Sequence, residues 1–183
     1  MRHIYSSVVM WMALVLPCVA SAQVVTTSPA IVQTDSKNIV ITFHADQGNK
    51  GLMGVTQSSK VYAHTGVITD KSDGEWAYAP TWLDNSAKYQ LTYVSPNTWT
   101  LSIPDITTYY GVKSGETVEK LAFVFRDATG SKEGKTASGG DIFVDVLPPG
   151  FQMMLESDLD GGMLTDNTPV RFTVNTTGNA DIS

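Results

Sequence analysis

The sequence predicts an all-β protein: an immunoglobulin-like β-sandwich, followed by the start of a second β-sandwich domain. Short segments rich in Val, Ile, Phe, Tyr and Thr recur along the chain, separated by clusters of Asp, Asn, Gly, Ser and Pro. This spacing is typical of strands joined by turns. No long amphipathic helical pattern interrupts it. A weak internal similarity at domain-length spacing predicts the second sandwich.

The segment 1–22 has the layout of a secretory signal peptide. A charged start, Met1–His3, precedes the apolar run Val8–Ala20, and the small residues Ala20–Ala22 follow. The run is shorter than the ~20 apolar residues that a spanning helix needs. We therefore expect cleavage after Ala22 and a mature protein that is secreted or at the cell surface, with no membrane insertion.

Removal of the segment 1–22 changes the cysteine content and the charge. The only cysteine, Cys18, is lost, so the mature chain can form no disulfide and depends on core burial. A lipid anchor at Cys18 is an alternative, against which Pro17 argues, because a small residue should precede a lipidated cysteine. The mature chain keeps 18 acidic and 11 basic residues, a formal charge of −7. This excess argues against nucleic acid or anionic membrane as a partner.

Strand periodicity assigns the apolar side chains to a core. The predicted strands are Asn38–Ala45, Val61–Ile68, Gln90–Val94, Thr98–Ile103, Leu121–Arg126 and Asp141–Leu147. Side chains alternate between the two faces of a strand, so each apolar set marks an inward face. These sets are Trp99, Leu101 and Ile103; Leu121, Phe123 and Phe125; and Ile142, Val144 and Val146. One helical turn is expected at Ile106–Tyr110.

Proline and glycine predict a domain boundary after position 148. The run Pro148–Gly150 cannot continue a strand, so we assign 23–148 to the first domain and 149–183 to a linker and the truncated start of a second immunoglobulin-like domain. The stretch from Thr165 repeats the pattern from Thr34 at a constant offset along the chain. About 34 residues are too few to bury a core alone. We expect the chain to be the N-terminal part of a longer secreted protein, with chance similarity among short strands as the alternative.

Catalytic and metal motifs are missing from the sequence. After signal cleavage only His44 and His64 remain as histidines, well separated along the chain and without a cysteine, which predicts no zinc site. The stretch Asp158–Gly162 has part of a calcium-loop pattern but lacks the later acidic ligands, so we interpret it as a turn. There is no Gly-x-Ser-x-Gly elbow or phosphate loop, and nothing places two carboxylates together. We predict no catalytic residues and no cofactor.

Aromatic residues gather in and after the strand that begins at Val61. Alternation puts Tyr62 and His64 on one strand face, and Trp76, Tyr78 and Trp82 follow within a short stretch. A flat aromatic ring offers an apolar surface to the C–H groups of a sugar, while polar neighbours bind its hydroxyls. These five residues are therefore the predicted carbohydrate-binding site. The alternative is that two or three of them anchor the core or a loop.

The segment "VYAHTGVITDKSDGEWAYAP" resembles the opening of starch-binding modules of carbohydrate-binding families 25 and 26. The later stretch "EKLAFVFRDATG…GGDIFVDV" is similar to strands near their end, so the resemblance spans about positions 60–146. It implies an α-glucan site lined by Tyr62, His64 and Trp76, with His64 bonding sugar hydroxyls and Trp76 as the stacking surface. The family usually carries another tryptophan where this chain has Ser131–Lys135.

The same resemblance implies a parent protein. Such modules precede the catalytic barrel of large exported amylases, so the chain is expected to be a non-catalytic starch- or α-glucan-binding module in the N-terminal part of a secreted α-amylase-type glycoside hydrolase. Its partners would be the α-glucan polysaccharide and downstream domains of the same polypeptide. The alternative function is a structural spacer or adhesin-type sandwich of a surface protein, without sugar binding.

Overall fold

A computed structural model of the chain describes residues 23–157 and 172–177. The predicted signal peptide, the Asp158–Gly162 turn and the repeat positions 165–171 lie outside the described residues. The described part is built mainly of β-strands, as the sequence predicts.

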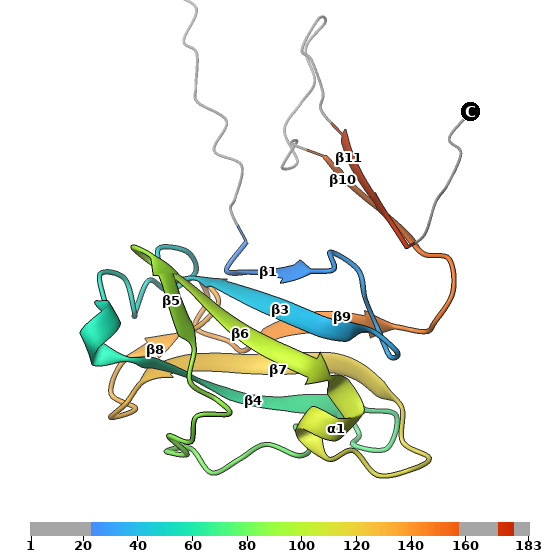
Figure 1. Cartoon of the computed structure of the whole chain (residues 1–183), viewed down its shortest axis with the longest axis horizontal. Coiled ribbons are helices and arrows are strands. Elements are labelled where there is room, and N and C mark those ends of the chain that lie inside the picture. The colour runs from blue at the N-terminus through green and yellow to red at the C-terminus, as the bar shows by residue number, and fades with distance from the viewer. Residues whose placement is uncertain (1–22, 158–171, 178–183) are drawn as a thin grey trace, which may run out of the picture.

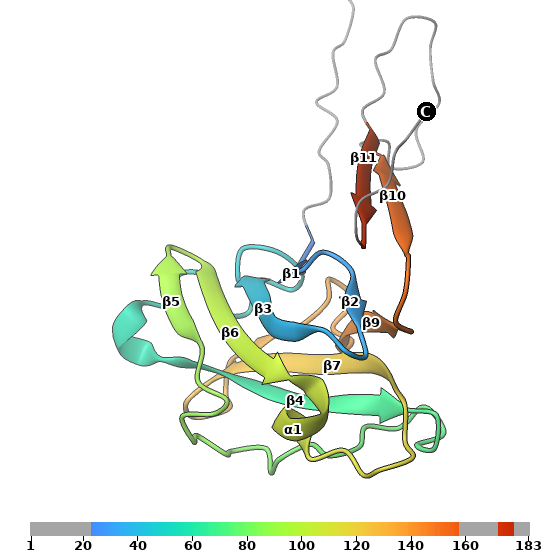
Figure 2. The ribbon, with the colours of Figure 1, turned by 45° about the vertical axis from the view of Figure 1, so that its right-hand side comes forward.

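The strands form a two-layer sandwich (Figures 1 and 2). One sheet has the order β1-β3-β6-β5 and the other the order β2-β9-β7-β4, with β8 added to β7. The bounds are β1 Val25–Ser28, β2 Val32–Gln33, β3 Lys37–His44, β4 Val61–Thr69, β5 Thr92–Ser95, β6 Thr98–Asp105, β7 Val118–Asp127, β8 Glu133–Gly134 and β9 Ile142–Leu147. This strand order is that of an immunoglobulin-type sandwich.

The first strand of the sandwich is divided between the two sheets. β1 pairs antiparallel with β3, with Val25 opposite Phe43, whereas β2 pairs parallel with β9, with Val32 opposite Val146. Neither strand was predicted from the sequence, because they are only four and two residues long. Strands this short show no readable alternation.

The predicted core faces are confirmed. Trp99, Leu101 and Ile103 are buried between the sheets, as are Leu121, Phe123 and Phe125 and, on β9, Ile142 and Val146; Val144 is partly buried. Across the sandwich the rings of Phe43 and Phe125 stack with centroids 4.1 Å apart. The apolar interior of one domain therefore lies between β3, β6, β7 and β4.

Two short helices complete the sandwich. The predicted helical turn is α1, Ile106–Tyr110. Asp105 caps it, its Oδ1 accepting a hydrogen bond from the backbone N–H of Thr108 at 2.7 Å. A 3-10 turn, η1, spans Gln57–Ser59. No helix in the described part of the chain is long and apolar enough to cross a membrane.

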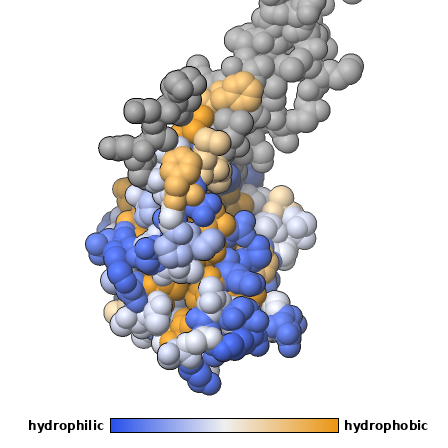
Figure 3. All heavy atoms as spheres, turned by 90° about the vertical axis from the view of Figure 1, so that its right-hand side faces the viewer, coloured by the Kyte–Doolittle hydropathy of each residue, from blue (hydrophilic) through white to orange (hydrophobic). Residues whose placement is uncertain are grey.

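A separate two-stranded sheet follows the sandwich. β10, Met153–Ser157, pairs antiparallel with β11, Phe172–Thr176. The side-chain N–H groups of Gln33 hold the linker by donating to the carbonyls of Pro148 at 2.9 Å and Gly150 at 2.7 Å. Figure 3, which views this side, shows hydrophobic side chains on the strand pair and on the sandwich beneath it.

The strand pair β10–β11 includes part of the predicted repeat. With Thr165 aligned to Thr34, Phe172–Val174 on β11 correspond to Ile41–Phe43 on β3. β3 pairs antiparallel with β1, and β11 pairs antiparallel with β10. Ile41 and Phe43 are buried, whereas Phe172 and Val174 are exposed. The second sandwich domain stays a prediction.

Candidate functional site

Strand β4 presents two different faces. Val61, Ala63 and Thr65 are at most 1% exposed and point into the sandwich, as alternation requires. Tyr62 and His64 therefore stand on the outer face of the sheet, as predicted. The question is what covers that outer face.

The long segment 70–90 runs back across the outer face (Figures 1 and 2). Near its start, the backbones of Val67 and Ala77 exchange two hydrogen bonds of 3.0 and 2.8 Å. Near its end, the N–H of Ala63 donates to the carbonyl of Tyr89 at 2.8 Å. Both ends of the segment are thus tied to β4, and the residues between them are held over the sheet.

Three predicted site residues meet where this segment crosses the outer face of β4. The ring of His64 stacks on Trp76, with centroids 5.4 Å apart and planes 19° apart. The same imidazole makes a T-shaped contact with Trp82, with ring centroids 4.9 Å apart and planes 68° apart. Both geometries are favourable for aromatic pairs. His64 and the two indoles are each partly exposed, so the group lies at the surface.

Arg126 joins this group, and the sequence analysis did not single it out. It lies opposite Tyr62 in the register of β4 and β7. Its guanidinium carbon is 5.3 Å from the ring centre of Tyr62 and 5.8 Å from that of Trp82, which is the range of a cation–π contact. We call Tyr62, His64, Trp76, Trp82 and Arg126 the outer cluster. The sequence feature that could have identified Arg126 is its position as a basic residue at the end of an otherwise apolar strand.

The other two predicted site residues serve packing. Tyr62 is 4% exposed and lies beneath Arg126, so its ring offers no free surface. Tyr78 packs against the sandwich core, and its hydroxyl oxygen accepts a hydrogen bond from the backbone N–H of Lys113 at 3.2 Å. The structure therefore brings together His64, Trp76 and Trp82 as the surface part of the site.

His64 has an unusual environment for a histidine. Its Nδ1 is buried and has no hydrogen-bond partner in the described part of the chain. Burial lowers the pKa of His64 below its ordinary value, and the nearby charge of Arg126 lowers it further, while Asp141 acts in the opposite direction. Both leading causes disfavour the charged form. The site therefore favours the neutral imidazole, which packs against both indoles.

The second histidine lies elsewhere. His44 is on β3, in the other sheet, where its Nε2 is 3.2 Å from the hydroxyl oxygen of Thr26. Among residues 23–157 and 172–177, no three His, Cys, Asp or Glu side chains gather in a way that could hold a metal ion. The two histidines therefore belong to separate surfaces.

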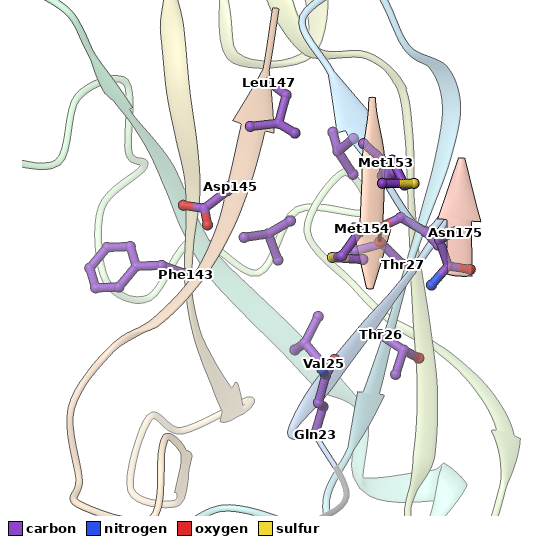
Figure 4. A pocket seen from close by; sticks show the side chains of 14 residues that line it. Gln23, Val25, Thr26, Thr27, Phe143, Asp145, Leu147, Met153, Met154 and Asn175 are labelled. Carbon is purple, nitrogen blue, oxygen red and sulfur yellow. Dashed lines mark hydrogen bonds between the residues drawn. The ribbon is translucent and has the colours of Figure 1, made fainter. Parts of the chain in front are cut away.

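A cavity of about 430 Å³ lies between the sandwich and β10–β11 (Figure 4). Its walls come from β1, β2, β9 and the strand pair. They include Val25, Thr27, Phe143, Leu147, Met153 and Asn175. None of the predicted site residues lines it, so this cavity and the outer cluster are distinct features.

No protein-family model matches the chain, and no curated protein matches it. The interpretation of the outer cluster therefore depends on its geometry and on the residues themselves.

Proposed function

We propose that the protein is a non-catalytic carbohydrate-binding module that holds an α-glucan against the partly exposed indoles of Trp76 and Trp82. The observation that supports this most is the contact of His64 with both indoles on the outer face of the sheet, stacked on Trp76 and T-shaped with Trp82. A ring that its neighbours already hold in place loses little further side-chain entropy when it binds a sugar.

The chemistry of the exposed rings suits a sugar. The cluster presents apolar ring surface beside polar groups, the mixture that sugar sites use. Asp141 acts electrostatically on His64, and we take its carboxylate as the candidate acceptor for hydroxyl groups of the sugar. The starch-binding modules that the segment resembles usually carry a tryptophan where this chain has Ser131–Lys135. Trp82 lies close to the neighbouring turn after β7, because a Cβ on Gly130 would stand 2.7 Å from Trp82 Nε1. Trp82 thus supplies an indole beside that turn from another segment.

In a longer secreted amylase-type enzyme, such a module would keep the catalytic domain near starch by raising its local concentration. This step rests on the resemblance of the segment that carries Tyr62, His64 and Trp76. The chemistry of hydrolysis would belong to that other domain.

The test is a titration of the mature chain with maltoheptaose, followed by tryptophan fluorescence in a Trp99→Phe background, because Trp99 is buried in the sandwich core. We expect a saturable change that Trp76→Ala abolishes. Cellohexaose is the matched control, since it presents the same sugar units through β-linkages. No response at millimolar maltoheptaose would refute the proposal, and normal binding by Trp76→Ala would refute the site.

A structural spacer without sugar binding is the second candidate. The observation that favours it is that Tyr62 and Tyr78, two of the five predicted site residues, are engaged in packing. If the cluster only fastens segment 70–90 to the sheet, Trp76→Ala will lower the stability of a protein that does not respond to maltoheptaose.

A further inference from the structure

We propose that Arg126 is a positioning residue, which fixes the loop 82–86 and thereby sets where the Trp82 indole stands. Its role in sugar binding rests on the function proposed above, while its effect on Trp82 does not. The inference comes from the burial of Arg126, from its hydrogen bonds and from the absence of a carboxylate partner among the described residues.

Arg126 is buried where a charged residue is unexpected. It is 1% exposed, although arginine is almost never fully buried unless paired. Its guanidinium is within cation–π distance of the rings of both Tyr62 and Trp82. The group therefore contacts an aromatic ring of the sheet and an indole of the covering segment.

The hydrogen bonds of Arg126 point to the loop that follows Trp82. One terminal nitrogen, Nη2, donates to the carbonyl of Asp84 at 2.8 Å. The other, Nη1, donates to the side-chain oxygen of Asn85 at 2.8 Å and to the carbonyl of Asp127 at 3.0 Å. One rigid fork thus joins two consecutive loop residues to the end of β7. Such a double contact requires the fixed geometry of a guanidinium.

Asn85 completes the connection. Its side-chain nitrogen donates to the carbonyl of Ala128 at 2.9 Å, in the turn after β7. The loop is therefore fastened at both the guanidinium and the turn. Trp82 stands two residues before Asp84, and its T-shaped contact with His64 transmits the position to the stack with Trp76.

Stability alone does not account for this arginine. None of the ion pairs within residues 23–157 and 172–177 includes Arg126, and its Nε is buried without a partner there. A buried charge with no carboxylate at salt-bridge distance is costly, and Asp84 and Asp127 act on this guanidinium only through longer-range electrostatics. The loop acceptors lie near the surface, where water can replace the guanidinium. The contacts serve geometry more than folding energy.

The experiment uses the mature chain with Trp76→Phe and Trp99→Phe, in which Trp82 is the only tryptophan. Arg126→Met is expected to shift Trp82 emission to longer wavelength, increase its quenching by acrylamide and speed amide exchange in the loop 82–86 about tenfold or more. Lys120→Met removes an exposed cation from the same strand and is the matched control. It should change none of these measurements.

Two further variants keep the test decisive if Arg126→Met folds poorly. Arg126→Lys retains a cation but not the fork, and is expected to behave like Arg126→Met. Asn85→Ala removes one surface acceptor and should give the same changes at smaller amplitude. Unchanged emission and exchange in Arg126→Met, or full restoration by Arg126→Lys, would overturn the positioning role.

The sugar measurement separates the two proposals. If the chain with all its tryptophans binds maltoheptaose, Arg126→Met should weaken the Kd about tenfold or more while the urea midpoint changes little. If that chain does not bind, the proposed function fails, and the emission and exchange data still decide whether Arg126 positions Trp82. An unchanged Kd together with a displaced Trp82 would overturn the link between position and binding.

Discussion

The two faces of β4 differ in the chemistry of the side chains that pack against them. Its inner face joins an interior of aliphatic side chains and phenylalanine rings, in which Phe43 and Phe125 stack. Its outer face joins a histidine, an arginine and two indoles beneath one covering segment. The inner face stabilises the fold by removing apolar area from water. The outer face places polar groups where burial costs free energy.

The inner and outer faces also differ in how many buried side-chain nitrogens lack a hydrogen-bond partner. Three buried side-chain nitrogens have no hydrogen-bond partner in the described part of the chain, and two of them, His64 Nδ1 and Arg126 Nε, belong to the outer cluster. The third is the indole nitrogen of Trp99 in the core. Natural proteins depart from polar satisfaction mostly where function or specificity requires it. The outer cluster is therefore the better candidate for a site, although its strand residues directly neighbour core residues along β4.

The largest expected effect comes from breaking the inner face. Phe125 is fully buried, so Phe125→Ala should leave a cavity against Phe43 and lower the free energy of unfolding by about 3–5 kcal/mol. Urea denaturation measures the change. Phe143→Ala is the matched control, because Phe143 is 48% exposed on the neighbouring strand β9. A loss of similar size in the control would mean that burial does not distinguish these two phenylalanines.

An intermediate effect is expected where the outer cluster meets the turn after β7. Gly130 has a φ of +72°, and a Cβ there would stand 2.7 Å from Trp82 Nε1. Gly130→Ala should therefore strain the backbone, displace the indole and lower the free energy of unfolding by about 1–3 kcal/mol. Gly139→Ala is the matched control, since Gly139 has a φ of +82° but open space around it.

The difference between these two glycine variants isolates the contact with Trp82 and with the adjacent Leu83, whose Cδ2 would lie 2.8 Å from the new Cβ. Both carry the strain of a positive φ, and only Gly130→Ala crowds the indole. We expect a change in tryptophan emission in Gly130→Ala alone, with a larger loss in urea midpoint than in Gly139→Ala. Equal losses and equal emission spectra would show that Trp82 is free to move away from the turn.

The fold was predictable from the sequence because its strands carry strong local signals. The apolar alternation in β6, β7 and β9 is long enough to mark the inward face, and the outward position of Tyr62 and His64 follows from the same period of two. β1 and β2 were missed, because such short strands are defined by their partners. Pairing across the chain cannot be read from local composition.

The candidate site was only partly predictable. Alternation identified His64, and the tryptophans following β4 suggested a cluster, but no local pattern shows that segment 70–90 folds back over the sheet. That fold brings Arg126 beside Trp82, although the two residues lie far apart along the chain. It also buries Tyr62 under the guanidinium. The roles of the aromatics were therefore decided by tertiary contacts.

The smallest expected effect is a dependence of stability on pH that originates in the outer cluster. Burial and the charge of Arg126 lower the pKa of His64 in the folded protein. In the unfolded chain the pKa of a histidine is about 6.5. The unfolded state thus binds the proton first, and stability rises with pH in this range. The contribution of neutral His64 is complete above about pH 6.5 and is lost as the pH falls toward the lower folded pKa.

Urea unfolding at about pH 7.5 and about pH 5.5, on either side of the ordinary histidine range, measures this loss. His64→Gln should lose less stability than the wild-type protein between the two values, because glutamine takes up no proton. His44→Gln is the matched control, because it removes a histidine from the other sheet, beside Thr26, and leaves the outer cluster intact. Asp105, whose pKa is lowered to about 2 chiefly by its bond with Lys37, titrates below this window. Equal pH dependence in wild type and His64→Gln would show that folding does not change the pKa of His64.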